Sequence, residues 1–165
     1  MSIVFRSGML SEMKANIRIA LIGLVGGLLL GNANRAENKM FKQFLNVGDH
    51  QPPGYTQVVT AAPGKVIYIS GRGGADANGK LPADFDTQAK NTFEDLKKCL
   101  ALAGASFSDV VKINYYVTDL ANTGKLREIR ASYLNMKQPP AATLVQVGLG
   151  GGALVEIEAT AVVPQ

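Results

Sequence analysis

The chain has 165 residues, of which 47% are hydrophobic and 18% charged, and its formal net charge is +4. This length suits one domain with a sizeable core, and the composition is that of an ordinary globular protein. Cys99 is the only cysteine and His50 the only histidine. An intrachain disulfide and a cysteine metal site are therefore excluded, and neither a serine–histidine triad nor a multi-histidine metal site is expected. No dense basic run accompanies the positive charge, so nucleic acid is not an expected partner.

Residues 1–33 have the pattern of an N-terminal extension followed by a signal peptide. Met13 offers a second start, Arg18 adds positive charge, and Ile19–Leu30 is a charge-free apolar run. At about 12 residues, the run fits the hydrophobic region of a signal and falls short of the roughly 20 residues that span a membrane. We expect cleavage after Ala33, with the mature form beginning near Asn34, and export to a periplasmic location. An uncleaved segment would leave a cytoplasmic or membrane-anchored protein instead.

A polar lead-in, residues 34–54, precedes the expected domain, residues 55–165. Within the lead-in, FKQFL could form a short strand or a turn. Tyr55–Thr60 and Lys65–Ser70 are strand-like runs on either side of Pro63-Gly64, which predicts a hairpin. A loop rich in Gly, Asp and Asn follows.

Two helices and one strand are expected next. Apolar residues recur at helical spacing from Phe85 to Ala103, with Asp84 as the N-cap and Gly104 as the stop. The β-branched and aromatic run Val110–Val117 predicts a strand. A second helix should run from Gly124 to about Met136. We expect Asn122 to cap it, and its core stripe to consist of Leu126, Ile129 and Tyr133.

Two period-two runs, Ala141–Val147 and Ala153–Val163, end the chain as strands separated by a glycine cluster. The resulting order, ββαβαββ, predicts an α+β two-layer sandwich in which two helices cover one face of a sheet. The other face, where Leu144, Leu154 and Val162 are expected, would then need a partner.

Several segments together resemble one known family. The segments are GYTQVV, VIYISG, FDTQAKNTFEDLKKCLALAGAS, DVVKINYYVTDL and ALVEIEATAVV. In this order they resemble the Rid family (RidA or YjgF, once labelled L-PSP endoribonuclease) over residues 55–163. The resemblance implies the chorismate-mutase-like fold and a homotrimer with ligand clefts between subunits. Neither the residues nor the resemblance indicates a metal or an organic cofactor.

The resemblance also implies site residues. In Rid deaminases an arginine in the motif PARS binds the substrate carboxylate, and a glutamate opening EIEA positions the water that attacks the C=N carbon of an imine. Glu156 matches that glutamate, Ser70 and Gly71 match the serine and glycine of the family, and Tyr55 matches its tyrosine. The alternatives are a packing role for Tyr55, a backbone-bonded hydroxyl for Ser70 and an interface carboxylate for Glu156.

This chain departs from the deaminase pattern at the arginine. PAAT replaces PARS, so Ala142 stands where the clamp is expected, and Leu144 stands where cysteine or threonine is common. Arg72 and Arg127 replace a glutamine and an asparagine of the family. Either one could supply a displaced clamp. Arg72 would share a face with Ser70 if the strand continued regularly between them.

The expected function is binding of a small polar or anionic metabolite by the trimer, with weak or no imine deaminase activity because of Ala142. The alternative is an active 2-imino acid deaminase that uses Glu156 and a displaced arginine. If the protein is an enzyme, it would be a hydrolase acting on C=N bonds. Endoribonuclease activity and a non-enzymatic interaction trimer are further alternatives.

Overall fold

The computed structural model describes residues 41–48 and 50–165, and residues Lys42–Gln165 form one compact unit. The expected signal segment and the cleavage after Ala33 lie outside the described residues. Lys42–Leu45 from the expected lead-in form the strand β1, which is part of the compact unit. Among the residues that the structure describes, no helix has the length and apolar character needed to cross a membrane.

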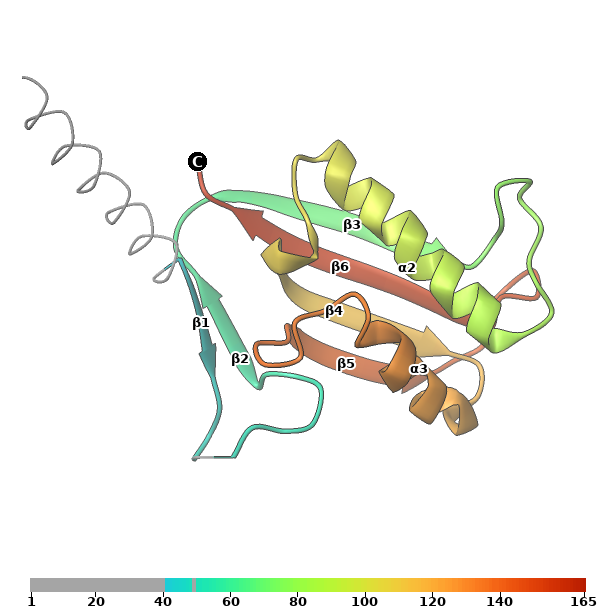
Figure 1. Cartoon of the computed structure of the whole chain (residues 1–165), viewed down its shortest axis with the longest axis horizontal. Coiled ribbons are helices and arrows are strands. Elements are labelled where there is room, and N and C mark those ends of the chain that lie inside the picture. The colour runs from blue at the N-terminus through green and yellow to red at the C-terminus, as the bar shows by residue number, and fades with distance from the viewer. Residues whose placement is uncertain (1–40, 49) are drawn as a thin grey trace, which may run out of the picture. The chain divides into compact units, whose positions relative to one another are not determined.

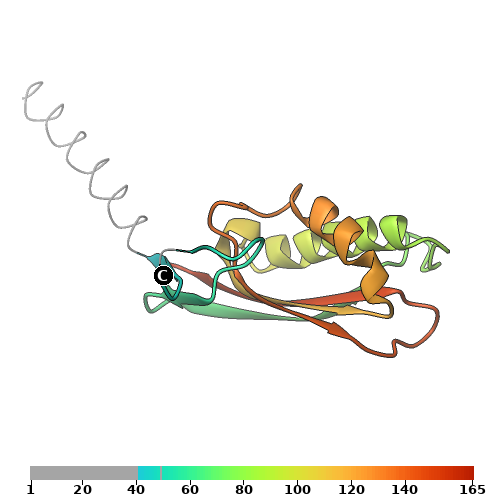
Figure 2. The ribbon, with the colours of Figure 1, turned by 90° about the horizontal axis from the view of Figure 1, so that it is seen from below.

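A four-stranded sheet carries two helices on one of its faces (Figures 1 and 2). The spatial order of its strands is β3-β6-β4-β5, with β4 and β5 parallel and the other pairs antiparallel. The elements of this unit, besides short 3₁₀ turns, are β1 (Lys42–Leu45), β2 (Val58–Ala61), β3 (Lys65–Gly73), α2 (Phe85–Leu102), β4 (Val110–Val117), α3 (Thr123–Arg130), β5 (Ala141–Gln146) and β6 (Val155–Val163). The predicted α+β two-layer sandwich with the chorismate-mutase-like fold is confirmed.

The predicted hairpin between the first two strands is wrong. β2 pairs with β1 in a separate two-stranded sheet, with Lys42 opposite Ala61. β3 pairs instead with β6 in the four-stranded sheet. Each of these two strands has nine residues, whereas β2 has four. Pairing with β6 therefore gives β3 a longer ladder of backbone hydrogen bonds than a hairpin with β2 would.

The first helix, α2, begins and ends as its terminal residues predict. The carboxylate of Asp84 accepts a hydrogen bond from the backbone N–H of Thr87, 2.8 Å away, which satisfies a free donor of the first turn. Gly104 follows the helix with φ +74°, a conformation that glycine adopts without a steric penalty.

The second helix, α3, is shorter than predicted and begins differently. It ends at Arg130, and Asn122 makes no capping hydrogen bond through its side chain. Asp119 caps the preceding 3₁₀ turn, Leu120–Asn122, by accepting from Ala121 N at 2.8 Å. The capping side chain is therefore Asp119, before the 3₁₀ turn, and not Asn122.

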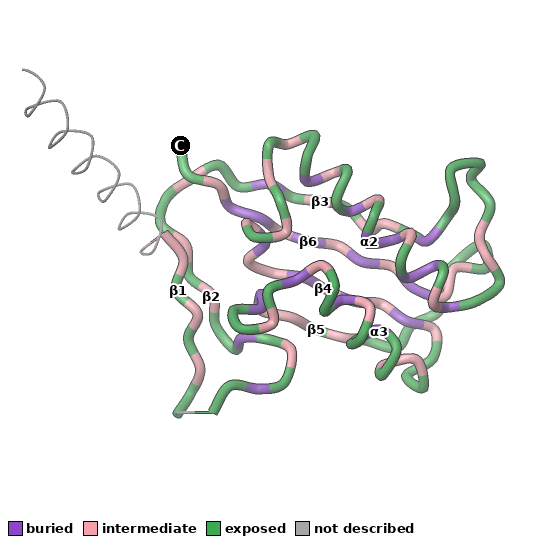
Figure 3. Tube along the Cα trace, viewed as in Figure 1, coloured by how far each residue is buried: buried purple, intermediate pink, exposed green. Residues whose placement is uncertain are grey.

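The core lies between the helices and the sheet and follows β6, β4 and α2 (Figure 3). Gln88 of α2 is only 1% exposed, and it binds the glycine-rich segment between β5 and β6 to the helix. Its Nε2 donates to the carbonyls of Pro82 and Gly152 at 2.7 and 3.1 Å, and its Oε1 accepts from Leu154 N at 2.8 Å.

Only one of the three apolar residues predicted for the uncovered face lies there. Leu144 is paired with Tyr115, whose ring is buried under the helices, and Leu154 packs against the core, so the placement of these two leucines was wrong. Val162 is buried. The exposed apolar residues of the uncovered face include Val66, Tyr68 and Val145.

Candidate functional site

Glu156 lies on the face of the sheet that the helices leave open. Its neighbours in β6, Val155 and Ile157, are fully buried on the helix side, and strand alternation turns Glu156 the other way. A β-carbon added at Gly71 would overlap the Glu156 carboxylate. The glycine therefore makes room for this carboxylate, and the two predicted residues are in direct contact.

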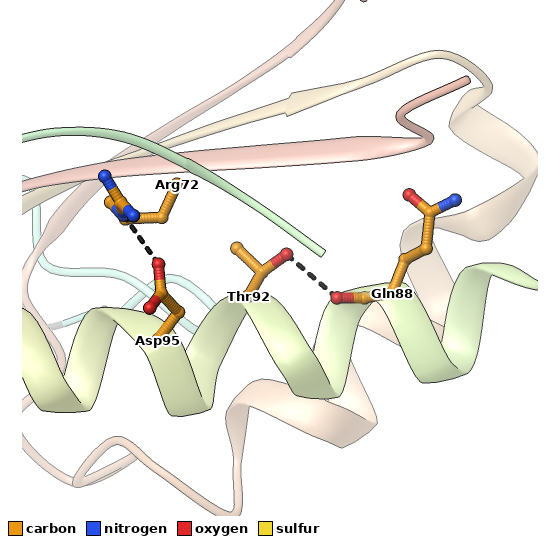
Figure 4. Close-up of polar contacts among 4 residues, drawn as sticks. All are labelled: Arg72, Gln88, Thr92 and Asp95. Atoms are coloured by element: carbon orange, nitrogen blue, oxygen red, sulfur yellow. Dashed lines mark hydrogen bonds and ion pairs between the residues drawn. The ribbon is translucent and has the colours of Figure 1, made fainter. Parts of the chain in front are cut away.

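The backbone of β3 is irregular beside this contact. The pairing of β3 with β6 shifts register between Ile69 and Arg72, which is the signature of a β-bulge. Ser70 stays on the open face, whereas Arg72 turns toward α2 and donates from Nε to Asp95 Oδ2 at 2.7 Å (Figure 4). This hydrogen bond raises the pKa of Arg72. The expectation that Ser70 and Arg72 share a face is wrong.

Ser70 lines a hollow of about 260 Å³ on the open face, beside Lys112, Asn114 and Glu158. Glu158 Oε1 accepts hydrogen bonds from Asn114 Nδ2 at 2.7 Å and from the Tyr116 hydroxyl at 2.9 Å. These two bonds lower the pKa of Glu158, and the bond to the carboxylate raises the pKa of Tyr116. The two donors, both from the neighbouring strand β4, therefore stabilise the charged form of Glu158.

A second hollow, of about 340 Å³, lies between α3 and β5, and we call it the α3–β5 pocket. Four predicted site residues meet there, namely Tyr55, Arg127, Ala142 and Leu144. The parallel pairing of β4 and β5 places Ala142 opposite the buried Ile113, so residue 142 faces the helix layer. The remaining lining is Pro53, Tyr115, Thr123, Leu126, Arg130 and Thr143.

Sequence reasoning missed Arg130, the last residue of α3. The residue is only 7% exposed, its guanidinium carbon lies 5.9 Å from the centroid of the Tyr115 ring, and a β-carbon added at Gly54 would overlap the guanidinium. A signal was present, because Arg130 follows the core residue Leu126 by four positions and therefore lies on the same helix face.

The predicted site residues thus form two groups within one chain. Ser70, Gly71 and Glu156 belong to the open face, and Ala142 faces the helix layer in the α3–β5 pocket. No group of three or more His, Cys, Asp or Glu side chains that could hold a metal ion occurs in residues 41–48 and 50–165.

Comparisons with known proteins agree with this architecture. A family model described as Endoribonuclease L-PSP matches residues 50–163. The chain is 36% identical over 110 residues to a mouse protein named 2-iminobutanoate/2-iminopropanoate deaminase. The aligned residues cover 66% of this chain and 80% of the mouse protein.

Solved structures give the same assignment. A Rid-family protein from Yersinia pestis, YyfB, superposes with a TM-score of 0.65 at 30% identity, covering 75% of this chain and all of that one. Escherichia coli TdcF with bound serine gives a TM-score of 0.56 at 30% identity, covering 67% and 91%. The chain therefore belongs to the Rid family, whose family model carries the description Endoribonuclease L-PSP.

Proposed function

We propose that this protein binds a small polar or anionic metabolite and deaminates 2-imino acids weakly or not at all. The observation that carries the proposal is Ala142 in the wall of the α3–β5 pocket. Its methyl group offers no hydrogen bond and no charge to a carboxylate. A bidentate arginine–carboxylate pair contributes about 1.5–3 kcal/mol, so its loss costs about ten- to a hundredfold in affinity.

Relatives support the ligand class. A mouse relative is named for deamination of 2-iminobutanoate and 2-iminopropanoate, and the TdcF structure holds serine. Both names describe small molecules with a carboxylate and a nitrogen on the adjacent carbon. We infer that the ligand of this protein has a similar size and charge.

We further propose that the protein is a homotrimer and that its site is completed between subunits. Glu156 and Ala142 lie on opposite faces of one sheet, so a ligand that touches both must lie between two copies. The exposed Val66, Tyr68 and Val145 on the open face supply apolar surface for such an interface.

The alternative is an active deaminase with a displaced arginine. Arg72 does not serve this alternative within one chain, because its guanidinium is bonded to Asp95 on the helix side. Arg127 lines the α3–β5 pocket but is exposed to solvent. Water weakens the attraction between an exposed guanidinium and a carboxylate, so Arg127 alone is a poor replacement for a partly desolvated clamp.

The proposal is tested by ammonia release from 2-iminopropionate generated in situ. The full chain is compared with buffer alone, since the imine also hydrolyses spontaneously, and with Glu156→Gln. We expect the native rate to stay close to both controls. Rapid turnover by the native chain that is lost in Glu156→Gln would support the alternative.

A further inference from the structure

We propose that Arg130 is the anion anchor of the α3–β5 pocket and that the pocket takes a small monocarboxylate there. The inference deepens the proposed function, on which it rests, by naming the residue and the ligand class of the same site. The anchor reaches the pocket from the end of α3 and not from β5, where the family resemblance places an arginine. A carboxylate bound to Arg130 therefore takes a different pose from the one that the deaminase clamp would impose, and the proposed weak turnover still follows.

Arg130 is a buried cation whose charge the described residues do not balance. The residue is 7% exposed, and none of the ion pairs among residues 41–48 and 50–165 includes it. Its Nε is buried and has no hydrogen-bond partner within the same residues. A guanidinium stays charged at every physiological pH, and a buried charge without a partner is costly. A carboxylate ligand would remove this cost.

The surroundings of Arg130 hold the guanidinium without neutralising it. Tyr115 presents its ring face at 5.9 Å, a favourable cation–π distance, and Gly54 packs so closely that no side chain fits. Gly54 has φ +86°, which makes glycine the natural residue at this contact. The side chain is thus positioned before any ligand arrives, which reduces the entropy lost on binding.

Tyr115 supplies a second donor to the same pocket. Its hydroxyl is buried and has no hydrogen-bond partner among the described residues. Burial raises the pKa of Tyr115 to about 12, and the charge and the nearby N–H groups of Arg130 only partly oppose this shift. The hydroxyl therefore stays protonated near pH 7, and it and the guanidinium both seek acceptor oxygens.

The rest of the lining limits the ligand to a small, partly apolar molecule. Ala142, Leu126 and Leu144 provide apolar walls in a volume of about 340 Å³. One buried cation matches the single charge of a carboxylate better than the double charge of a phosphate. A short 2-oxo acid is small, partly apolar and singly charged, and it therefore meets these requirements.

The binding test uses pyruvate as the probe and the full chain labelled with ¹⁵N. Pyruvate is titrated while the guanidinium Nε–H signals are followed, and the Arg130 signal is assigned by its loss in Arg130→Lys. We expect pyruvate to shift this signal. The Kd for pyruvate should rise about ten- to a hundredfold in Arg130→Met. Pyruvamide, which is of similar shape and uncharged, should bind the native chain at least about tenfold more weakly than pyruvate.

Two further variants separate the anchor from general charge. Lys125→Met makes the same charge change on the same helix, outside the pocket lining, and should leave the Kd within about twofold. Arg127→Met should cost less than Arg130→Met because Arg127 is exposed.

Several outcomes would overturn the proposal. They are unchanged pyruvate affinity in Arg130→Met, a larger loss in Arg127→Met, equal affinity of the native chain for pyruvate and pyruvamide, or tighter binding of inorganic phosphate. If Arg130→Met does not fold, two measurements decide. They are the comparison of pyruvate with pyruvamide on the native chain and the Kd of Arg130→Lys for pyruvate. Binding and turnover are separate readouts, so rapid imine turnover would refute the proposed weak activity while leaving the Arg130 result intact.

Discussion

Ala142 and Glu156 project from opposite faces of the same four-stranded sheet. Ala142 is paired with the buried Ile113 and faces the helix layer. Glu156 lies between two residues of β6 that are buried on the helix side, so its own side chain points to the open face. One chain therefore cannot present both side chains to one small ligand. The two positions can contact the same ligand only if they belong to different copies of the chain. The site proposed here therefore depends on the proposed trimer.

The first prediction concerns that assembly. Tyr68 is 81% exposed on the open face, an unusual position for a large aromatic side chain. We expect light scattering of the full chain to give the mass of three chains at micromolar concentration. Tyr68→Asp should shift the mass toward the monomer, because a carboxylate would be buried at the interface. A stable native monomer would contradict the trimer.

The second prediction tests the contact between Gly71 and Glu156. A methyl group at Gly71 would overlap the carboxylate, whereas one at Gly73 would meet nothing within 4 Å, and neither glycine requires positive φ. Gly71→Ala should lower the free energy of unfolding by about 1 kcal/mol, the low end of the cost of overpacking, because the Glu156 carboxylate ends a flexible side chain and can turn away.

Gly73→Ala in the same strand is the matched control and should change this free energy by no more than about 0.5 kcal/mol. Urea unfolding of both variants measures the difference. Equal effects of the two substitutions would mean that the close approach of Glu156 to Gly71 does not exist in solution.

Local signals in the sequence predicted most of the fold. Asp84 and Gly104 marked the ends of α2, and the β-branched run Val110–Val117 matches β4. These predictions succeeded because capping, glycine conformation and β propensity act within a few residues. The choice of β6 as the partner of β3 depends on contacts between distant segments, which local patterns do not encode.

The site was less predictable for the same reason. The bulge after Ile69 reverses the side-chain alternation, so Arg72 faces α2 although it is two residues beyond Ser70. Arg130 was missed because an arginine in a short polar helix usually lies at the surface. Its burial becomes evident only when the Gly54 segment is folded against it.

The third prediction concerns Arg72, which the structure removes from the candidate site. The side chains of Arg72 and Asp95 are 39% and 34% exposed, so their ion pair is screened by water. Arg72→Ala should lower the free energy of unfolding by at most about 1 kcal/mol, and the loss should shrink at high salt. Pyruvate binding should not change. A marked loss of pyruvate affinity would return Arg72 to the site.

The fourth prediction is a pH dependence that arises from Glu158. Hydrogen bonds from Asn114 and Tyr116 lower its pKa in the folded state. The stabilisation is therefore complete above the unfolded pKa of about 4.3 and is lost as the pH falls through the lower folded value. The difference in unfolding free energy between the native chain and Glu158→Gln should be constant above about pH 5 and shrink below about pH 4.

Tyr116→Phe removes one of the two donors, so the loss of stability at acid pH should begin at a higher pH than in the native chain. Urea unfolding at a series of pH values measures each curve. If the native chain and Glu158→Gln lose stability in parallel below pH 4, the two hydrogen bonds do not favour the charged carboxylate in solution.

The most direct measurement is the rate of 2-iminopropionate deamination by the native chain, by Ala142→Arg and by the mouse deaminase under the same conditions. If Ala142 accounts for a missing clamp, the native kcat/KM should lie at least about ten- to a hundredfold below that of the mouse enzyme. Ala142→Arg should recover part of this difference if Glu156 of a neighbouring copy is still placed to act. Native turnover within a few-fold of the mouse enzyme would contradict the account.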